Sequence, residues 1–292
     1  MSDFSTLAGN ATKITARGFG WTHAGRKQPA LADLDLVIEP GERVLLCGDS
    51  GSGKSTLLAA MAGVLGSDEE GTRTGEILLE DSTGMVEEPG RSIPVGLVLQ
   101  DPDSQVISAR VGDDIAFGCE NLAYPREEIW RRVAAAKDLV GPFVPLDFPT
   151  ERLSGGQKQR LALAGVIAMG AGVVLLDEPT ANLDPDGARD VVRAVSALVE
   201  ETGATLVVVE HQHAAWKGVL ERAVELDHGR IVSDGPFAEV AQRRQVEGLP
   251  QARRLGEAEL AGRRAALWST DLVTRYGPPR TISLPAGSST VI

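Results

Sequence analysis

The fold is decided by the stretch Gly48-Asp49-Ser50-Gly51-Ser52-Gly53-Lys54-Ser55-Thr56. The apolar run before it, Val44 to Cys47, is typical of a buried strand, and Leu57 to Ala62 after it is typical of a helix. A strand, a glycine-rich loop ending in Lys-Ser and a helix form the setting of a phosphate-binding loop. We therefore predict that this chain binds a nucleoside triphosphate.

Each residue type in the loop suits that chemistry. Glycines let the backbone bring its N–H groups against phosphate oxygens, and the start of a helix adds unpaired N–H groups and a positive dipole end. Lys54 supplies a point charge to the β- and γ-phosphates, and the Ser55 hydroxyl can ligate Mg²⁺. The nucleotide contacts expected in this loop come from Gly48, Ser50, Gly51, Ser52, Gly53, Lys54, Ser55 and Thr56.

Composition narrows the class of protein. The 292 residues include 29 Lys and Arg against 41 Asp and Glu, a net charge of −12 that argues against a nucleic-acid binder. No apolar run approaches the roughly 18 residues that would span a bilayer, and Met1 to Ser5 shows no secretory signal. Cys47 and Cys119 are expected to be buried rather than bridged, which fits a reducing cytoplasm.

The remaining pattern predicts an α/β fold. Strands are expected at Ile14 to Trp21 and at Leu34 to Ile38, whereas the helical spacing from Val111 to Leu146 indicates a helical subdomain inserted into the α/β core. Trp21 can stack on an adenine or pack in the core, and its spacing leaves both roles open. The segment Leu153 to Arg160 opens a long helix whose first turn is a second potential anion site.

Two further strands carry polar residues at their carboxyl ends. Asp177 and Glu178 follow an apolar strand, which places an aspartate near the metal and a glutamate where it can deprotonate water. His211 follows the strand Thr205 to Val209, on the ligand side of an α/β sheet. A histidine there can reach a γ-phosphate or serve no catalytic role, and the sequence by itself leaves the choice open.

Taken together, residues 12–240 resemble the ATP-binding cassette (ABC) ATPases. That resemblance implies a RecA-like P-loop NTPase core, an antiparallel β subdomain and an inserted helical signature subdomain at about residues 105–168. The matching motifs stand in the family's order. They are the Walker A loop at Gly48–Thr56, the Q-loop Gln100, the signature Leu153–Gln157, the Walker B strand Val173–Glu178, the D-loop Ala181–Asp184, the switch His211 and, at the position of the adenine-stacking aromatic, Trp21.

The resemblance implies a mechanism in which two cassettes pack head to tail and enclose ATP and Mg²⁺. The nucleotide-contacting set then extends to Ser154, Gly155, Gly156, Gln157 and Asp184, with Ser154 and Gly156 completing the site of the partner cassette. The implied roles in hydrolysis are phosphate and metal binding by Lys54, Ser55 and Asp177, positioning of metal and water by Gln100, activation of water by Glu178 and support of the γ-phosphate by His211.

Within the family, Gln100-Asp101-Pro102-Asp103-Ser104-Gln105 resembles the Q-loop of energy-coupling factor (ECF) transporters, which import vitamins and metal ions. This implies a peripheral subunit on the cytoplasmic face of the membrane, bound to a transmembrane T component beside a substrate-capturing S component. The nutrient stays open. A cytosolic tandem-cassette ATPase acting on ribosomes is the alternative, although Gln157 favours transport. A regulatory module without turnover conflicts with Glu178 and His211 both being present.

The last residues repeat the beginning of the chain. Ile282 to Gly287, followed by Thr290 to Ile292, resembles Leu36 to Gly41 followed by Val44 to Leu46. We therefore expect a helical linker at 241–264 and, at 265–292, the start of a truncated second cassette that ends just before its own phosphate loop. A β-rich tail with an accidental likeness is the other reading.

Overall fold

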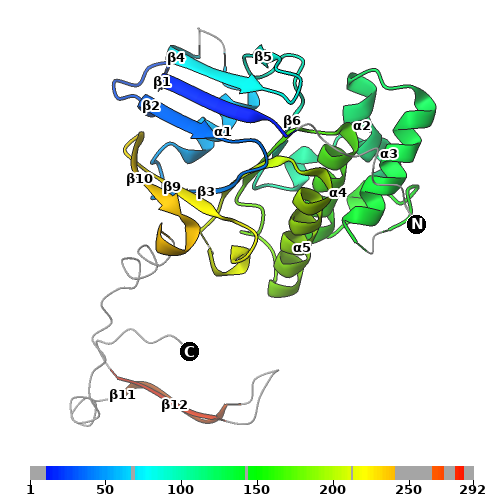
Figure 1. Cartoon of the computed structure of the whole chain (residues 1–292). Coiled ribbons are helices and arrows are strands. Elements are labelled where there is room, and N and C mark those ends of the chain that lie inside the picture. The colour runs from blue at the N-terminus through cyan, green and yellow to red at the C-terminus, as the bar shows by residue number, and fades with distance from the viewer. Residues whose placement is uncertain are drawn as a thin grey trace. The chain divides into compact units, whose positions relative to one another are not determined.

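The strand before the phosphate loop, β3, lies inside a six-stranded sheet in the computed structural model, which describes residues 11–66, 70–141, 144–211, 213–240, 265–272 and 280–285 (Figure 1). Strands β9, β3, β8, β7 and β6 are parallel, and β10 closes one edge antiparallel to β9. In sheet order the strands are β10 (Arg230–Pro236), β9 (Arg222–Asp227), β3 (Arg43–Gly48), β8 (Thr205–Val209), β7 (Val173–Asp177) and β6 (Val95–Val98).

A second, antiparallel sheet forms the predicted β subdomain. Its strands, in sheet order, are β2 (Leu31–Ile38), β1 (Lys13–His23), β4 (Gly71–Glu80) and β5 (Val86–Glu87). The sequence pattern predicts a loop from Gly63 to Gly75 and a short strand from Ile77 to Leu79, but β4 is longer than that strand. It pairs with β1 from Glu80 to Gly71, so polar residues expected in a loop belong to the ladder.

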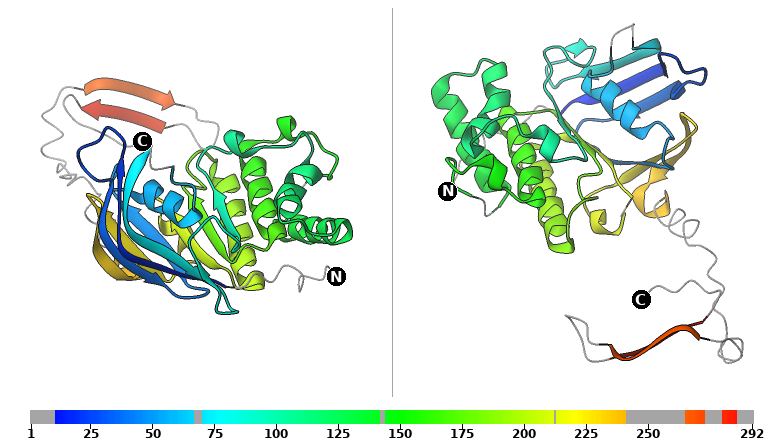
Figure 2. Two further views of the ribbon diagram at one scale, coloured as in Figure 1. Left: turned by 90° about the horizontal axis from the view of Figure 1, so that it is seen from above. Right: turned by 180° about the vertical axis from the view of Figure 1, so that it is seen from behind.

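Helix α1 (Lys54–Ala62) shares one apolar core with the inner residues of β1 and β2 and with one face of the six-stranded sheet. The opposite face of that sheet is covered by a second core that includes α4 (Gly155–Met169) and α5 (Pro185–Thr202) (Figure 2). The central strands β3, β7 and β8 are therefore buried on both faces, whereas the edge strand β10 is not. This explains why Val44 to Cys47 and Leu206 to Val209 are continuously apolar.

The inserted helical subdomain packs α2 (Val111–Asn121) and α3 (Arg126–Leu139) against α4. The sequence also predicts a break in this helical region at Tyr124-Pro125, which is confirmed because Pro125 is the N-cap of α3. The amphipathic pattern predicts a helix from Asp190 to Glu200. Helix α5 begins five residues earlier, since Asp184 caps it and Pro185 occupies its first turn. Among the described residues, η2 (Asp103–Gln105) and η3 (Thr150–Arg152) are short 3-10 helices that flank this subdomain, and η4 (His213–Trp216) is another that lies between β8 and β9.

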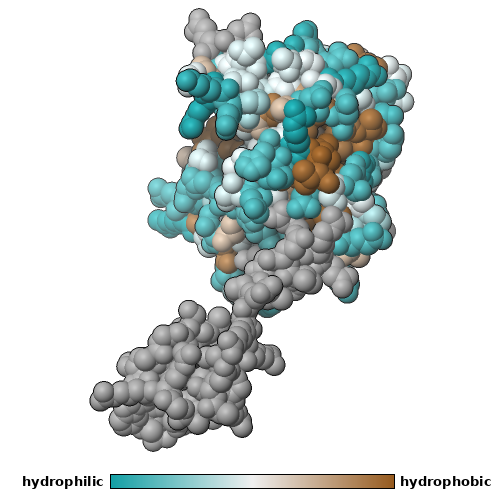
Figure 3. All heavy atoms as spheres, turned by 90° about the vertical axis from the view of Figure 1, so that its left-hand side faces the viewer, coloured by the Kyte–Doolittle hydropathy of each residue, from teal (hydrophilic) through white to brown (hydrophobic). Residues whose placement is uncertain are grey.

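The chain divides into two compact units, Met1–Arg244 and Gln245–Ile292. In the second, β11 (Ala265–Leu272) and β12 (Arg280–Pro285) pair antiparallel. The predicted linker at 241–264 lies outside the described residues. None of the described helices is long and apolar enough to cross a bilayer, and the face drawn in Figure 3 is largely hydrophilic with a few apolar patches.

Candidate functional site

The phosphate loop joins β3 to α1, and its glycines are required by close backbone approach. Gly48 and Gly53 have φ values of +146° and +107°. A Cβ on Gly48 would lie 2.2 Å from the Leu226 carbonyl oxygen, and one on Gly53 would lie 2.6 Å from the Ala30 carbonyl oxygen. Strands β9 and β2 therefore press on the loop from outside, and only glycine fits at these two positions.

Lys54 begins α1 and folds back over the loop. Its Nζ donates hydrogen bonds of 2.9 Å to the carbonyl oxygens of Gly48 and Asp49. Ser52 is 4% exposed, and its hydroxyl has no hydrogen-bond partner among the described residues. A buried cation, an unsatisfied hydroxyl and a helix N-terminus in one glycine-lined cradle suit a phosphate group.

Asp177 and Ser55 provide a donor set for a metal. The Ser55 hydroxyl donates a hydrogen bond to the Asp177 carboxylate, and burial raises the pKa of Asp177 against that hydrogen bond. The described residues contain no cluster of three or more His, Cys, Asp or Glu side chains that would form a closed metal cage. One carboxylate and one hydroxyl fit Mg²⁺, which usually retains water and phosphate ligands.

Glu178 lies at the centre of a three-residue contact. Its Oε2 accepts a hydrogen bond of 2.9 Å from Nε2 of Gln100, and its Oε1 lies 3.1 Å from Nε2 of His211. The three residues follow β6, β7 and β8, which are adjacent parallel strands, so their carboxyl ends meet at one edge of the sheet. Glu178 has a φ of 47°, a conformation that is uncommon for a side chain with a Cβ.

The signature segment forms a capped helix start. The Ser154 hydroxyl accepts from the backbone N–H of Gln157, and the Gln157 side chain accepts from the backbone N–H of Ser154 at 2.9 Å, which is a capping box. Asp184 caps α5 in a similar way, accepting from the N–H of Gly187 at 2.6 Å. These residues, with Gly155 and Gly156, line an open hollow of about 370 Å³ that has no phosphate-loop residue in its wall.

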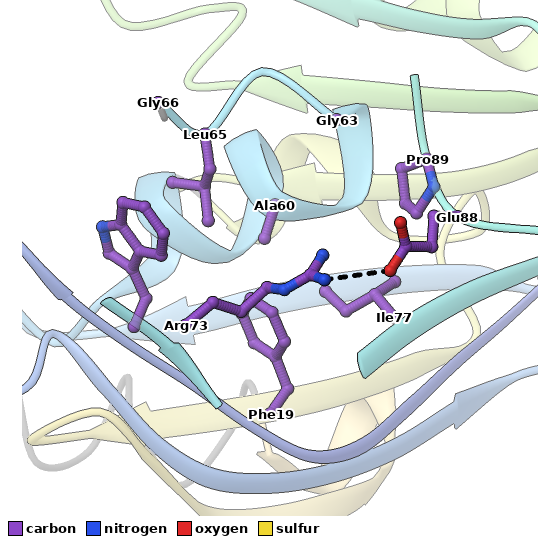
Figure 4. Close-up of a pocket in the computed structure, with 10 residues that line it drawn as sticks. Phe19, Ala60, Gly63, Leu65, Gly66, Arg73, Ile77, Glu88 and Pro89 are labelled. Atoms are coloured by element: carbon purple, nitrogen blue, oxygen red, sulfur yellow. Dashed lines mark hydrogen bonds and ion pairs between the residues drawn. The ribbon is translucent and has the colours of Figure 1, made fainter. Parts of the chain in front are cut away.

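The Trp21 side chain packs in the core, which is one of the two roles that its spacing leaves open. It is 4% exposed, its Nε1 donates to Nδ1 of His23 at 3.1 Å, and it belongs to the apolar core around α1. Trp21 also lines a hollow of about 430 Å³. Arg73 and Glu88, which line the same hollow, form an ion pair at 3.0 Å (Figure 4). Stacking of this ring on an adenine stays a prediction.

Two residues that the sequence pattern did not assign lie against the site. Glu210, which is 2% exposed, accepts hydrogen bonds from the Thr180 hydroxyl and from the backbone N–H of His211. Glu210 directly follows the buried strand β8. Its place at a strand's carboxyl end was the available signal, although an acidic residue next to a histidine does not by itself indicate a buried contact.

Known proteins are similar in sequence to most of this chain. The family model described as "ABC transporter" matches residues 31–181. A putative ABC transporter ATP-binding protein of Methanosarcina acetivorans is 39% identical over 77% of this chain but only 35% of its own length, so this chain spans about a third of that relative. The energy-coupling factor transporter ATP-binding protein EcfA1 of Caldanaerobacter subterraneus is 38% identical over 76% of this chain and 78% of that protein.

Among solved structures, cbiO1 of Clostridium perfringens, described as part of the ABC transporter complex cbiONQ, is 31% identical. It covers 82% of this chain and 93% of its own, with a TM-score of 0.68. The likeness therefore extends through the α/β core and both subdomains.

Proposed function

This chain belongs to the ABC transporter family of ATP-binding proteins, and on that premise we propose that it hydrolyses ATP as the nucleotide-binding subunit of an ECF-type importer. Members of the family hydrolyse ATP to power transport. The observation that carries the proposal is the contact of Gln100, Glu178 and His211 at the strand edge that also holds Lys54 and Asp177.

The proposed chemistry assigns one role to each side chain. Glu178 accepts the proton of the attacking water, and its two neighbours hold its carboxylate in place. Because an ionised carboxylate oxygen only accepts, Nε2 of His211 carries the proton in this contact, and His211 would have to leave Glu178 to donate to the γ-phosphate. Lys54 and the loop N–H groups bind the phosphates, and Ser55 and Asp177 would hold Mg²⁺, which neutralises phosphate charge when bound.

A second cassette completes the proposed site. The capped start of α4 presents Ser154 and Gly156 beside Asp184 in the hollow described above, away from this chain's own phosphate loop. A helix N-terminus with glycines suits the γ-phosphate of a nucleotide bound to a partner cassette. We infer head-to-tail packing of two cassettes from this separation within one chain.

The importer is proposed to be of ECF type, with a vitamin or metal ion as cargo. Support comes from the Q-loop sequence Gln100 to Gln105 and from the name of the Caldanaerobacter relative. The partners would be a transmembrane T component and a substrate-binding S component, with the cassette held at the cytoplasmic face of the membrane. In this loop, Oε1 of Gln105 accepts a hydrogen bond from the backbone N–H of Leu99 at 2.9 Å, and Nε2 of Gln105 donates to the Leu99 carbonyl at 3.1 Å. These two hydrogen bonds fix the start of the segment.

Copurification tests the assignment. The full chain is tagged and expressed in its native organism. It is then purified separately from detergent-solubilised membranes and from the ribosome fraction, and the proteins that copurify from each are identified by mass spectrometry. An integral membrane protein bound in stoichiometric amount, with ATPase activity that Glu178→Gln abolishes, is the expected result. Recovery with ribosomes alone would reject the importer, and unchanged activity in Glu178→Gln would reject the catalytic assignment.

A further inference from the structure

Glu210 has no role in the chemistry assigned above, yet it stands beside the proposed base. Strands β7 and β8 are parallel neighbours in which Asp177 is paired with Val209, and the N–H of Glu178 donates to the Val209 carbonyl at 2.9 Å. The two strands therefore end together, each followed by a glutamate. The Glu178 side chain is 22% exposed and faces His211, whereas Glu210 is 2% exposed and turns inward.

The buried carboxylate of Glu210 joins two segments of the site. Its Oε2 accepts from the hydroxyl of Thr180, two residues after Glu178, and its Oε1 accepts from the backbone N–H of His211 at 2.8 Å. Thr180 is itself only 4% exposed. One side chain thus fixes both the turn that follows the proposed base and the backbone that carries the histidine.

The turn that Glu210 holds is strained. The φ of 47° at Glu178 is unfavourable for a residue with a Cβ, and such conformations persist only where surrounding contacts impose them. The backbone contributes two contacts, from Glu178 N–H to Val209 and from Ala181 N–H to the Glu178 carbonyl at 3.2 Å. The hydrogen bond from the Thr180 hydroxyl to the Glu210 carboxylate anchors the same turn through a side chain.

Burial makes this arrangement costly unless both oxygens are used. A carboxylate removed from water needs hydrogen bonds to compensate for its lost hydration. Glu210 uses both oxygens on groups within two residues of Glu178 and His211, so its hydrogen bonds are directed at the site.

We propose that Glu210 is a positioning residue, which sets the distance and orientation between Glu178 and His211 through Thr180 and the His211 backbone. The inference rests on the proposed ATP hydrolysis at this site. Glu210 touches no substrate in this scheme, because its side chain is enclosed. Loss of its contacts should lower turnover while nucleotide binding by the phosphate loop stays intact.

The test compares Thr180→Val, Glu210→Gln and the double variant with wild type in the full chain. Thr180→Val removes one hydroxyl and keeps the shape of the side chain. Thr202→Val is the matched control, since Thr202 is also buried and its hydroxyl donates to Leu198 at 2.7 Å, at the far end of α5. The readouts are kcat, KM for ATP, affinity for a fluorescent ATP analogue and thermal midpoint.

We expect kcat to fall about tenfold or more in both single variants, with KM and nucleotide affinity within about twofold of wild type. The double variant should be no worse than the poorer single variant, because the two residues act through one contact. The Thr202→Val control should change the thermal midpoint alone. A kcat within twofold of wild type in Thr180→Val and Glu210→Gln, with lowered thermal midpoints, would make Glu210 a purely structural residue and overturn the proposal.

Crystal structures of the same variants separate this proposal from the proposed function. If Glu210 positions the site, the Glu178 to His211 contact lengthens beyond 3.1 Å and Glu178 leaves its positive φ, whether or not the protein turns over ATP. An unchanged distance between Glu178 and His211 in Thr180→Val would count against the positioning role of Glu210, even if the wild type hydrolyses ATP. Absence of ATPase activity in the wild-type complex would instead reject the proposed function.

Discussion

Oε1 of Glu178 lies 3.1 Å from Nε2 of His211, although 33 residues separate them in the sequence. The contact forms because β7 and β8 are adjacent and parallel, so both residues emerge at the same edge of the sheet. Gln100, at the end of β6, closes the other side of the carboxylate at 2.9 Å. A carboxylate held between two donors in this way is oriented before any substrate arrives.

Replacing Glu178 by Gln should remove turnover without removing ATP binding. The amide keeps the size of the side chain but cannot take a proton from water, so kcat should fall by about a hundredfold or more. Steady-state ATPase assays and binding of a fluorescent ATP analogue measure the two effects separately. Glu120→Gln, on the exposed surface of α2, is the matched control and should leave both unchanged.

Replacing His211 by Ala should lower kcat by about tenfold to a hundredfold. The ring is half exposed, so little packing is lost and the thermal midpoint should stay within about 2 °C of wild type. His228→Ala is a suitable control, because His228 is almost fully exposed in the turn between β9 and β10. Equal activity in the two variants would show that His211 plays no part in hydrolysis.

The sequence was sufficient for the elements whose pattern is local. The phosphate loop, the break before α3 and the polar residues at the strand ends follow from residue type and spacing, and the structure places them as expected. The length of β4 was not predictable, because its polar half is held by pairing with β1 rather than by its own pattern. The contact of Glu210 with Thr180 was hidden for a similar reason, since it depends on the register of two strands.

Trp21 packs in the core around α1, and its predicted contact with an adenine stays a prediction. Its position matches the adenine-stacking aromatic of the family, but the ring is enclosed by the core around α1. Side-chain direction near the irregular register of β1, between Phe19 and Trp21, cannot be inferred from spacing alone. The expectation of a second, truncated cassette at 265–292 stays a prediction, to which the antiparallel pairing of β11 and β12 adds one compatible fact.

Cys119 should resist alkylation in the folded protein. Burial raises the pKa of its thiol to about 11, which lowers the thiolate fraction near pH 8 by about a hundredfold relative to an ordinary thiol of pKa 9. Iodoacetamide labelling followed by mass spectrometry should modify Cys119 only after unfolding in guanidinium. Rapid labelling of the native protein at this site would show that the packing of α2 is open.

The raised pKa of Cys119 also makes the free energy of unfolding depend on pH in alkaline solution. The unfolded thiol loses its proton near pH 9 and the folded thiol near pH 11, so stability contributed by the protonated thiol declines as the pH rises through this range. Lys and Tyr residues titrate there too, so the useful quantity is the difference between wild type and Cys119→Ala. That difference should shrink between about pH 9 and pH 11, and a constant difference would contradict the shifted pKa.

Gly53 and Gly25 provide a matched pair that separates backbone strain from steric clash. Both have positive φ, +107° and +74°, so replacement by Ala costs about 1–2 kcal/mol of strain at either position. At Gly25 a Cβ meets no atom within 4 Å, whereas at Gly53 it would lie 2.6 Å from the backbone oxygen of Ala30 and 2.7 Å from Leu31. Gly53→Ala must therefore displace β2 or distort the start of α1.

We expect Gly25→Ala to bind ATP as wild type does and Gly53→Ala to lose most of its affinity, measured by fluorescent-nucleotide titration with thermal midpoints recorded in parallel. Equal affinity in the two variants would mean that the loop can move away from β2, and the cradle would then not depend on this close approach.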